Sequence, residues 1–454
     1  MKRRQFLAGS ITAAAAARVI AQNDVEARSR ETTTVNVLPP QGRLPASFVI
    51  DDSTCLVNMG HFCTPQFAEC YPGRTAYQKA WQNWPREIPD DFVREFRDWC
   101  GENGVKGKYS IVPYPACVGW LDQELPGWSR QRLQSSLRLV RETMLSNWDI
   151  HPEMITHTRV IDLKTGRPMQ AIHPGTMENS YPQSDVSVDH LASYLAYALR
   201  ILKRCGLPCE GITTPGGFGN RVSSKLPFAV DQAVRDVFNI ELPHYFKYIH
   251  SLEQGTEPIV EAIREAHDDK PLMTVNVPAG TGDWYGGWQG DLESSPDNYL
   301  SLDGQTGRLA ELIQRRQPVV FLCHWPGMFC NGTKSGFRAF QRNVQTLNEV
   351  YGDSILWMKL SEIARYWAAK RVTKIVTKSS VIELDAPLAT SNFTLEVTGN
   401  LVAPVLQFQN QLIHMRKVGS AIALQRGSWT CDGETMTVCF DLPRGRSQLA
   451  FQRT

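Results

Sequence analysis

The sequence lacks a strong net charge of either sign. Its 48 lysines and arginines nearly balance 46 aspartates and glutamates, which gives a formal charge of +2, and basic residues form a run only in the first few positions. A nucleic-acid-binding chain usually carries a basic patch, so we predict no nucleic-acid partner. Beyond the N-terminus the chain also lacks an apolar run of the length that crosses a bilayer, and we expect no membrane span in the mature protein.

Cysteine motifs are missing as well. The chain has 11 cysteines, an odd number, and no two of them have Cys-x-x-Cys spacing. This excludes the usual zinc-ribbon and thioredoxin-like patterns. Cys205 and Cys209 are close enough in sequence for a disulfide, but we interpret most of the cysteines as small buried apolar residues.

The N-terminus has the pattern of an export signal. Residues 1–21 combine a basic start, an Ala-rich apolar middle and a small-residue end, and the segment RRQFL resembles a twin-arginine signal. We therefore expect the twin-arginine export machinery as a partner and a periplasmic or secreted mature protein. Residues 22–45 are polar and without period, and we expect them to form a flexible leader.

Strand-like and helix-like segments alternate over residues 46–370. Short apolar runs are followed by amphipathic stretches, of which 90–105, 129–148 and 187–208 are the clearest. This alternation predicts an α/β fold, specifically a (β/α) barrel of seven or eight units. From residue 371 to residue 454, short β-branched runs separated by Asn, Gly, Asp and Pro predict an all-β, sandwich-like module.

Polar residues gather where the predicted strands end. Asp51 and Asp52 follow the apolar run FVI, His157 follows the run MIT, and His324 follows VVFLC. In a barrel of parallel strands these ends meet on one face, where catalytic groups are found. Two adjacent carboxylates repel each other unless a cation or hydrogen bonds stabilise them, so a bound metal would explain the pair.

These motifs, in this order, resemble the polysaccharide deacetylase (NodB-homology) superfamily. FVIDD resembles its Asp-Asp after a hydrophobic strand, and His157 with Thr158 resembles the start of its His-Thr/Ser-x-x-His motif. Asp283 and Trp284 stand where its Asp-Trp segment belongs, and PVVFLCHWPG resembles its last strand, which ends in His. The resemblance covers residues 46–360 through short motifs only.

The chain departs from this family at two positions. Ile161 stands four residues after His157, where the family has its second metal-binding histidine. Thr213 replaces the Arg of the Arg-x-Pro-Tyr motif, of which only Pro215 remains. A metal site needs about three protein ligands, so a third ligand has to come from elsewhere.

The resemblance implies a metal-dependent hydrolase that removes ester-linked or N-linked acetyl groups from a polysaccharide. Asp52 and His157 would bind a divalent metal, with zinc as the first candidate, and His61 is our candidate for the third ligand. Asp51 would take a proton from the attacking water. His324 would protonate the leaving group.

Aromatic residues among glycines suggest a sugar-binding loop. The segment GTGDWYGGWQGD carries Asp283 and three rings, and exposed rings of this kind stack on pyranose faces. The residues that we expect to contact substrate are Thr213, Pro215, Asp283, Trp284, Tyr285, Trp288 and Trp325.

Two other functions are compatible with the sequence. Asp51 or Asp52 paired with Asp283 or Asp291 would form the two carboxylates of a metal-independent glycoside hydrolase. Alternatively, a barrel that has lost a metal-binding histidine and an arginine would bind glycans without turnover. Chelator sensitivity distinguishes the first alternative from the metal-dependent reaction.

Overall fold

The computed structural model describes residues 33–251, 253–264, 272–378, 380–399 and 401–453. The predicted export signal and the first part of the predicted leader lie outside the described residues. In the part that is described, no helix is both long enough and apolar enough to span a bilayer.

A parallel five-stranded sheet forms the centre of the larger domain. Its strands are β2 (Leu44–Asp51), β3 (Gly107–Ile111), β4 (Trp148–Pro152), β11 (Val319–His324) and β12 (Ile355–Trp357). Strand β2 pairs with β11 along one edge and with β12 and then β3 along the other, and β4 lies beyond β3. Every residue of β2 is buried, which explains why its sequence is mostly apolar rather than alternating.

A second sheet adjoins the first. It contains β7 (Gly211–Thr213), β8 (His244–Phe246), β10 (Leu272–Asn276) and β9 (Ile259–Arg264), in that order, and only β9 is antiparallel to its neighbour. A single bridge between Glu153 and Thr213 links β4 to β7, and the Gly280 N–H donates to the Val320 carbonyl, 2.7 Å away.

The predicted α/β class with parallel strands is therefore confirmed, but the described strands of the predicted (β/α) barrel do not close into one sheet. The strands form two sheets rather than one continuous sheet. Strands β7 and β8 have only three residues each, so they offer too few ladder hydrogen bonds to close the circle.

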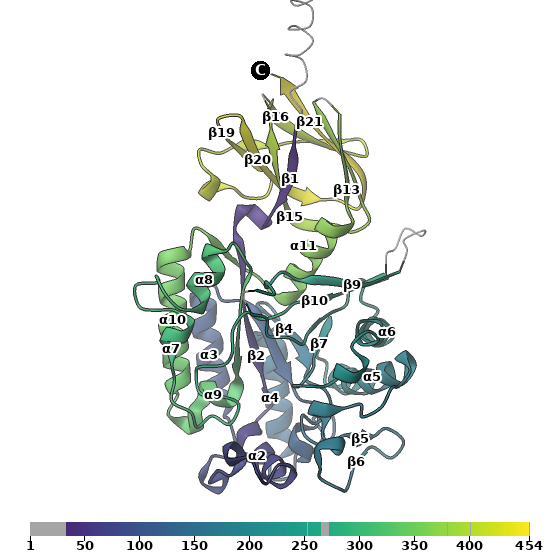
Figure 1. Ribbon diagram of the computed structural model, residues 1–454, viewed down its shortest axis with the longest axis vertical. Coiled ribbons are helices and arrows are strands. Elements are labelled where there is room, and N and C mark those ends of the chain that lie inside the picture. The colour runs from purple at the N-terminus through teal and green to yellow at the C-terminus, as the bar shows by residue number, and fades with distance from the viewer. Residues whose placement is uncertain (1–32, 252, 265–271, 379, 400, 454) are drawn as a thin grey trace, which may run out of the picture.

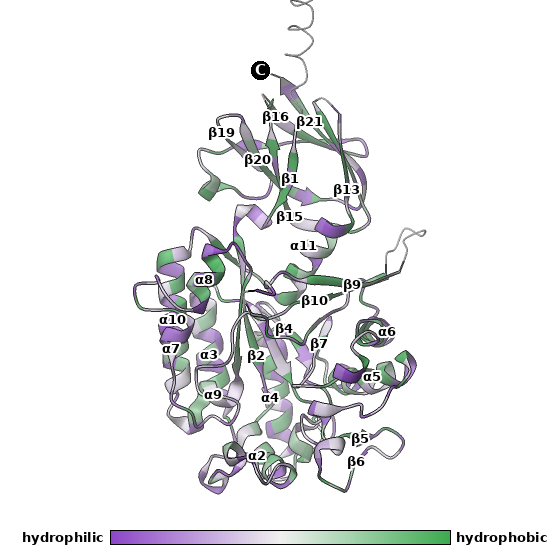
Figure 2. Cartoon of the chain, viewed as in Figure 1, coloured by the Kyte–Doolittle hydropathy of each residue, from purple (hydrophilic) through white to green (hydrophobic). Residues whose placement is uncertain are grey.

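Helices cover the sheets on the outside (Figure 1). They are α2 (Met59–Cys70), α3 (Asp90–Glu102), α4 (Arg130–Thr143), α5 (Val188–Arg204), α6 (Leu226–Phe238), α7 (Pro296–Tyr299), α8 (Arg308–Gln314), α9 (Trp325–Phe329), α10 (Ser335–Tyr351) and α11 (Leu360–Val372). The three clearest sequence predictions correspond to α3, α4 and α5. Ser129 and Ser187 cap α4 and α5 by accepting backbone N–H bonds. Figure 2 shows both apolar and polar residues along α3 and α10, as expected for helices with one face on a sheet.

The C-terminal region is a pair of five-stranded sheets. One contains β1 (Val35–Leu38), β15 (Thr390–Thr398), β18 (Arg416–Lys417), β19 (Ser428–Asp432) and β20 (Thr435–Leu442). The other contains β13 (Lys374–Lys378), β14 (Val381–Ala386), β16 (Leu401–Phe408), β17 (Gln411–His414) and β21 (Gly445–Arg453). Apolar side chains from both sheets share one buried cluster. A small separate ribbon contains β5 (Ile161–Asp162) and β6 (Arg167–Pro168).

The sequence analysis expects a flexible leader over residues 22–45, and here the structure differs. Strand β1 lies inside that range and pairs antiparallel with β15, with Val35 opposite Val397. Sequence reasoning missed this because the partner strand is more than 350 residues away. In Figure 1, β2 runs from the β-sandwich at the top to α2 at the bottom, so the carboxyl end of β2 faces away from the sandwich.

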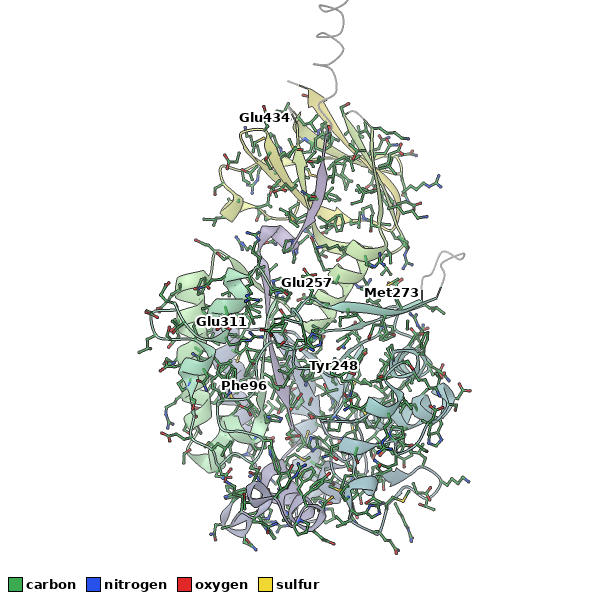
Figure 3. The ribbon with its side chains drawn as sticks, in the orientation of Figure 1. Phe96, Tyr248, Glu257, Met273, Glu311 and Glu434 are labelled. Carbon is green, nitrogen blue, oxygen red and sulfur yellow. The ribbon has the colours of Figure 1, made fainter. Side chains whose placement is uncertain are left out.

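Aromatic packing fixes the position of β2. Phe48 stacks on Phe340 at a centroid distance of 4.3 Å and lies 4.8 Å from Phe321, and such pairs contribute about 0.5–1.5 kcal/mol each beyond burial. A Cβ on Gly107 would lie 1.8 Å from the Phe48 carbonyl oxygen, so only glycine allows β3 to approach here. Figure 3 shows side chains filling the space between sheets and helices, with Phe96 of α3 fully buried.

The cysteines do not form disulfides. All 11 are free, and eight of them are buried, which agrees with their interpretation as small apolar residues. The disulfide considered for Cys205 and Cys209 is absent in the described structure.

Candidate metal centre

The first part of the site is the end of β2. Asp51 is the last residue of the strand and is level with His324 at the end of β11. Asp52 then turns out of the extended conformation, with φ 57°. A strand would direct these two side chains to opposite faces, and the turn removes that alternation. Positive φ is uncommon for a non-glycine residue, and aspartate tolerates it better than most.

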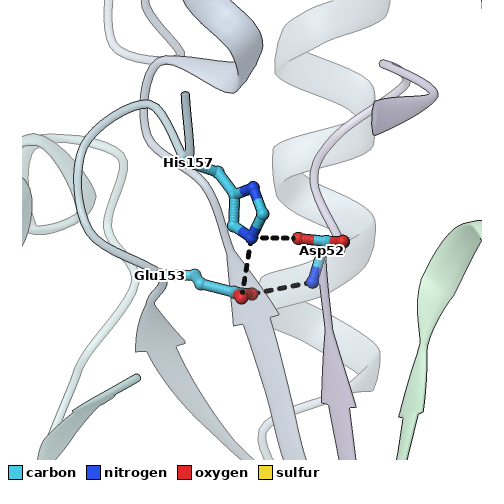
Figure 4. Close-up of side chains that lie close together, drawn as sticks. All are labelled: Asp52, Glu153 and His157. Atoms are coloured by element: carbon cyan, nitrogen blue, oxygen red, sulfur yellow. Dashed lines mark hydrogen bonds and ion pairs between the residues drawn. The ribbon is translucent and has the colours of Figure 1, made fainter. Parts of the chain in front are cut away.

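The second part is the segment that follows β4. His157 Nε2 lies 2.8 Å from Asp52 Oδ1 and 3.4 Å from Glu153 Oε1, and Glu153 Oε2 accepts the Asp52 backbone N–H at 2.7 Å (Figure 4). One possible ligand atom from each of the three residues lies within 4.8 Å of the others. Asp52 and Glu153 are buried, and His157 is nearly so.

This donor set fits a divalent cation. Two carboxylates and a neutral imidazole are ligands that zinc accepts, and the oxygens also suit harder ions such as manganese. Asp52 Oδ1 is buried and receives no hydrogen bond with good geometry from any described residue, although His157 Nε2 is close by. Burial lowers the pKa of His157, but the charge of Asp52 and the hydrogen bond to it outweigh burial and raise that pKa. Two buried carboxylates, Asp52 and Glu153, share this one imidazole, and a cation bound by all three would offset the cost of burying both charges.

Sequence reasoning named two of these three residues and missed Glu153. The structure brings Asp52 and His157 together, and the additional carboxylate lies four residues before His157, whereas the family comparison had directed attention to Ile161, four residues after it. The segment EMITH carries this spacing, so the signal was present in the sequence. The role of Asp52 and His157 as metal ligands stays a prediction.

His61 does not join this group. Its Nδ1 lies 3.0 Å from the Trp84 carbonyl oxygen, and its ring packs edge-on against Trp81 at 5.1 Å. Helix α2 nevertheless borders the site through two other residues: the Cys63 thiol lies beside His157, and the Phe67 ring is 6.3 Å from the imidazole.

Asp51 is paired with a lysine that sequence reasoning did not single out. The Lys108 ammonium group, fully buried on β3, donates to Asp51 Oδ1, to the Ile50 carbonyl at 2.9 Å and to Ser110 Oγ at 2.8 Å. Burial and the nearby negative charge of Glu153 raise the pKa of Asp51, and Lys108 opposes that rise. Asp51 is thus a carboxylate whose pKa is shifted toward neutral pH, which favours a general base.

His324 is held by Asp283. Its Nδ1 lies 2.8 Å from Asp283 Oδ2, which also accepts the His324 backbone N–H at 3.1 Å. Nε2 has no hydrogen-bond partner among the described residues. Burial lowers the pKa of His324, but the hydrogen bond that its Nδ1 donates to Asp283 and the negative charges of Asp52, Asp283 and Asp51 outweigh burial and raise the pKa to about 9. His324 is therefore a cationic proton donor at neutral pH.

The Asp283→Asn variant tests this arrangement. In metal-free protein we expect His324 to titrate near pH 9 and to titrate closer to its ordinary pKa in the variant, because the neutral amide no longer stabilises the imidazolium. A raised histidine pKa stabilises the fold below the unfolded pKa, and this stabilisation is lost as pH rises through about 9. NMR titration of the imidazole measures the shift. An unchanged pKa in Asp283→Asn would contradict this assignment.

Two of the aromatic residues expected to bind substrate lie in the hydrophobic core instead. Tyr285 stacks on Tyr299 at 4.1 Å, and Trp325 packs against Phe92 and Phe96; both Tyr285 and Trp325 have no exposed surface. The glycines around them allow the loop backbone to pack closely; they do not flank exposed aromatic rings.

Two glycines of this loop lie against the backbone of α9 too closely for any side chain. A Cβ on Gly286 would lie 2.5 Å from the Gly327 carbonyl oxygen, and one on Gly290 would lie 2.3 Å from the Pro326 carbonyl oxygen. The loop therefore packs directly on α9. A sequence pattern of rings between glycines does not distinguish this arrangement from an exposed binding loop.

The remaining predicted contact residues differ in position. Trp284 is partly buried and lies beside Tyr299. Trp288 is partly buried and packs against Phe67 and Tyr77 at 5.3 and 5.8 Å. Phe67 also contacts His157. Of the predicted substrate-binding rings, Trp288 is therefore linked to the Asp52 group through Phe67. Thr213, the last residue of β7, and Pro215, two residues later, are both buried, and Thr213 is bridged to Glu153.

Comparisons with known proteins give weak structural similarity only. No family model matches the sequence, and no curated protein matches it. A structure from Mycobacterium smegmatis, provisionally described as a polysaccharide deacetylase, is 13% identical over 76% of this chain and 99% of its own, with a TM-score of 0.39. One from Parabacteroides distasonis, provisionally described as a glycoside hydrolase/deacetylase, is 10% identical over 79% and 82%, with a TM-score of 0.39.

An α-L-fucosidase structure is 10% identical over 91% of this chain and 97% of its own, with a TM-score of 0.31. These three structures carry names of carbohydrate-active enzymes. TM-scores below 0.5 define neither a family nor a reaction, so the function of this chain has to be argued from its own side chains.

Proposed function

We propose that this protein is a metal-dependent hydrolase that removes acetyl groups, ester-linked or N-linked, from a polysaccharide. The observation that supports this most directly is the convergence of Asp52, Glu153 and His157 at the carboxyl ends of β2 and β4. Asp51 and His324, the proposed base and acid, stand at the ends of the neighbouring strands β2 and β11.

Each residue has a separate task in this proposal. A bound divalent cation would polarise the acyl oxygen and lower the pKa of water. Asp51, held by Lys108, accepts the proton of the attacking water. His324, held by Asp283, donates a proton to the departing sugar nitrogen or oxygen. Proton transfer by a positioned group of this kind contributes about 10²–10⁴-fold to a rate.

The glycoside hydrolase alternative is less well supported because the carboxylates it needs already have cationic partners. Asp283 is bonded to His324, Asp51 to Lys108, Asp291 lies 3.0 Å from Lys79, and Asp52 lies 2.8 Å from His157. Glycosidases need one carboxylic acid and one carboxylate facing the scissile bond. Each of these four carboxylates has a basic side chain beside it in the described structure.

The proposal also covers where the protein acts and how it contacts the sugar chain. We propose that the mature chain acts in the periplasm or outside the cell after twin-arginine export, and that Trp288, beside Phe67 and Tyr77, contacts the sugar chain. The β-sandwich lies at the opposite end of β2 from Asp51 (Figure 1). It therefore acts at a distance from the reacting groups, as a packing or glycan-binding unit.

The test is metal content together with acetate release from acetylated polysaccharides. We expect about one divalent ion per chain, acetate release that a chelator abolishes, and recovery on adding zinc or manganese. The Asp51→Asn variant should retain the ion and lose about 10²–10⁴-fold in rate. A protein that takes up no ion after reconstitution would contradict the proposal. Release of reducing ends in the presence of chelator would favour the glycosidase.

A further inference from the structure

A further buried carboxylate, Glu178, binds the segment that carries His157. Its Oε2 accepts the backbone N–H groups of Thr156 at 2.9 Å and His157 at 2.6 Å, and its Oε1 accepts the Ile155 N–H at 3.1 Å. The Tyr194 hydroxyl on α5 donates to Oε1 at 2.5 Å. Glu178 has no exposed surface, and no ion pair with Glu178 is found among the described residues.

Two residues of the segment that Glu178 binds have unfavourable backbone conformations. Met154 and His157 have φ of 53° and 64°, values that non-glycine residues seldom adopt and that cost about 1–3 kcal/mol each. Three successive backbone N–H groups pointing at one anion make a concave anion site, and the protein fills this one with its own side chain. A second contact comes from the main chain, since the Glu178 N–H donates to the Thr158 carbonyl at 2.6 Å.

Burial raises the pKa of Glu178, and the hydrogen bonds from Tyr194 and from three backbone N–H groups oppose that rise because they favour the ionised form. Burying a carboxylate without a cation is unfavourable, and a loop of relaxed conformation would satisfy its own N–H groups in solvent or by turns. The buried charge is explained if the backbone at His157 has to be held in one conformation that it would otherwise leave. That conformation directs Nε2 to within 2.8 Å of Asp52.

We propose that Glu178, supported by Tyr194, is a positioning residue for the metal site: by binding the backbone N–H groups of residues 155–157 it holds His157 in the orientation that brings its Nε2 to Asp52 and Glu153. This rests on the proposed metal-binding function. Glu178 does not touch the metal or the substrate. Its effect is on affinity for the ion, through the geometry of one ligand.

The experiment measures zinc affinity of full-length variants by competition with a chromophoric chelator. We expect affinity to fall by about 10–100-fold in Glu178→Ala, as is usual when a group supporting a ligand is lost. Glu178→Gln should fall less, because one oxygen acceptor remains, and Tyr194→Phe least, because the three backbone N–H bonds remain. The control is Asp231→Asn, which removes a buried carboxylate of α6 that is paired with Arg235 and lies outside the Asp52 group.

A second readout needs no metal. Hydrogen exchange of the amides of residues 155–157 should be slow in the intact metal-free protein and fast in Glu178→Ala, and it should be unchanged in Asp231→Asn. If the intact protein binds zinc and Glu178→Ala binds it equally well, the positioning role is wrong while the proposed function stands. If the intact protein binds no zinc, the proposed function fails. In that case, amide hydrogen exchange still tests whether Glu178 holds residues 155–157. Unaltered exchange in Glu178→Ala would show that it does not.

Discussion

The Glu153→Ala variant is expected to bind a divalent ion more than about 100-fold more weakly than the intact protein and to lose chelator-sensitive acetate release. Loss of a group that merely supports a ligand costs about 10–100-fold in affinity, so loss of a ligand costs more. The variant also leaves the Asp52 N–H without its acceptor. Metal content after dialysis, and affinity by chelator competition, measure the effect.

A matched control comes from the residue that sequence reasoning had proposed instead. His61→Ala removes an imidazole that faces Trp84 and Trp81, and we expect it to retain the ion. Glu153→Gln tests charge separately from size: it keeps one oxygen and should bind more weakly than the intact protein but better than Glu153→Ala. Loss of metal in His61→Ala with retention in Glu153→Ala would contradict the site as described.

The Lys108→Met variant is expected to lose about 3–5 kcal/mol of unfolding free energy, since removing one partner of a buried ion pair leaves the other charge uncompensated. Lys108 has no exposed surface and makes three polar contacts around Asp51. Methionine fills similar volume, so the change is mainly the loss of charge. Urea unfolding of the metal-free protein measures the difference.

The double variant Lys108→Met with Asp51→Asn separates the ion pair from packing. If the unpaired Asp51 carboxylate causes the loss, the double variant recovers a large part of the stability lost in Lys108→Met, because the neutral amide costs less to bury. Equal stability of the single and double variants would show that Lys108 acts through packing. Asp51→Asn alone leaves Lys108 buried without its anion and is expected to be destabilised as well.

Local patterns in the sequence identified much of the chemistry. An apolar strand that ends in Asp51 and Asp52, and another that ends in His324, are readable because strand ends and turns have short-range signals. The same holds for α3, α4 and α5, whose apolar period is a local pattern, and for the serine caps of α4 and α5. Glu153 was missed although its spacing to His157 was visible, because the family comparison placed the expected ligand after His157.

Other expectations failed because the relevant contacts are distant in sequence. Tyr285 and Trp325 look like binding residues beside glycines, and their burial depends on Tyr299, Phe92 and α9. Residues 35–38 have the polar, aperiodic sequence context of a leader, and they form strand β1 because they pair with β15. The predicted barrel depends on whether short strands meet at both edges, and β7 meets β4 through one bridge.

The amino-acid sequence by itself determined the α/β class, the main helices, the all-β C-terminal region and the strand-end positions of Asp51, Asp52 and His324, because each depends on the order and spacing of neighbouring residues. His157 was expected at a strand end as well, but it lies in the segment that follows β4, which ends at Pro152. Only the tertiary structure decided which of these residues meet. The grouping of Asp52, Glu153 and His157, the pairing of Lys108 with Asp51 and the support of Glu178 all cross between strands or loops. Such contacts depend on how separate elements pack, and no local pattern encodes that.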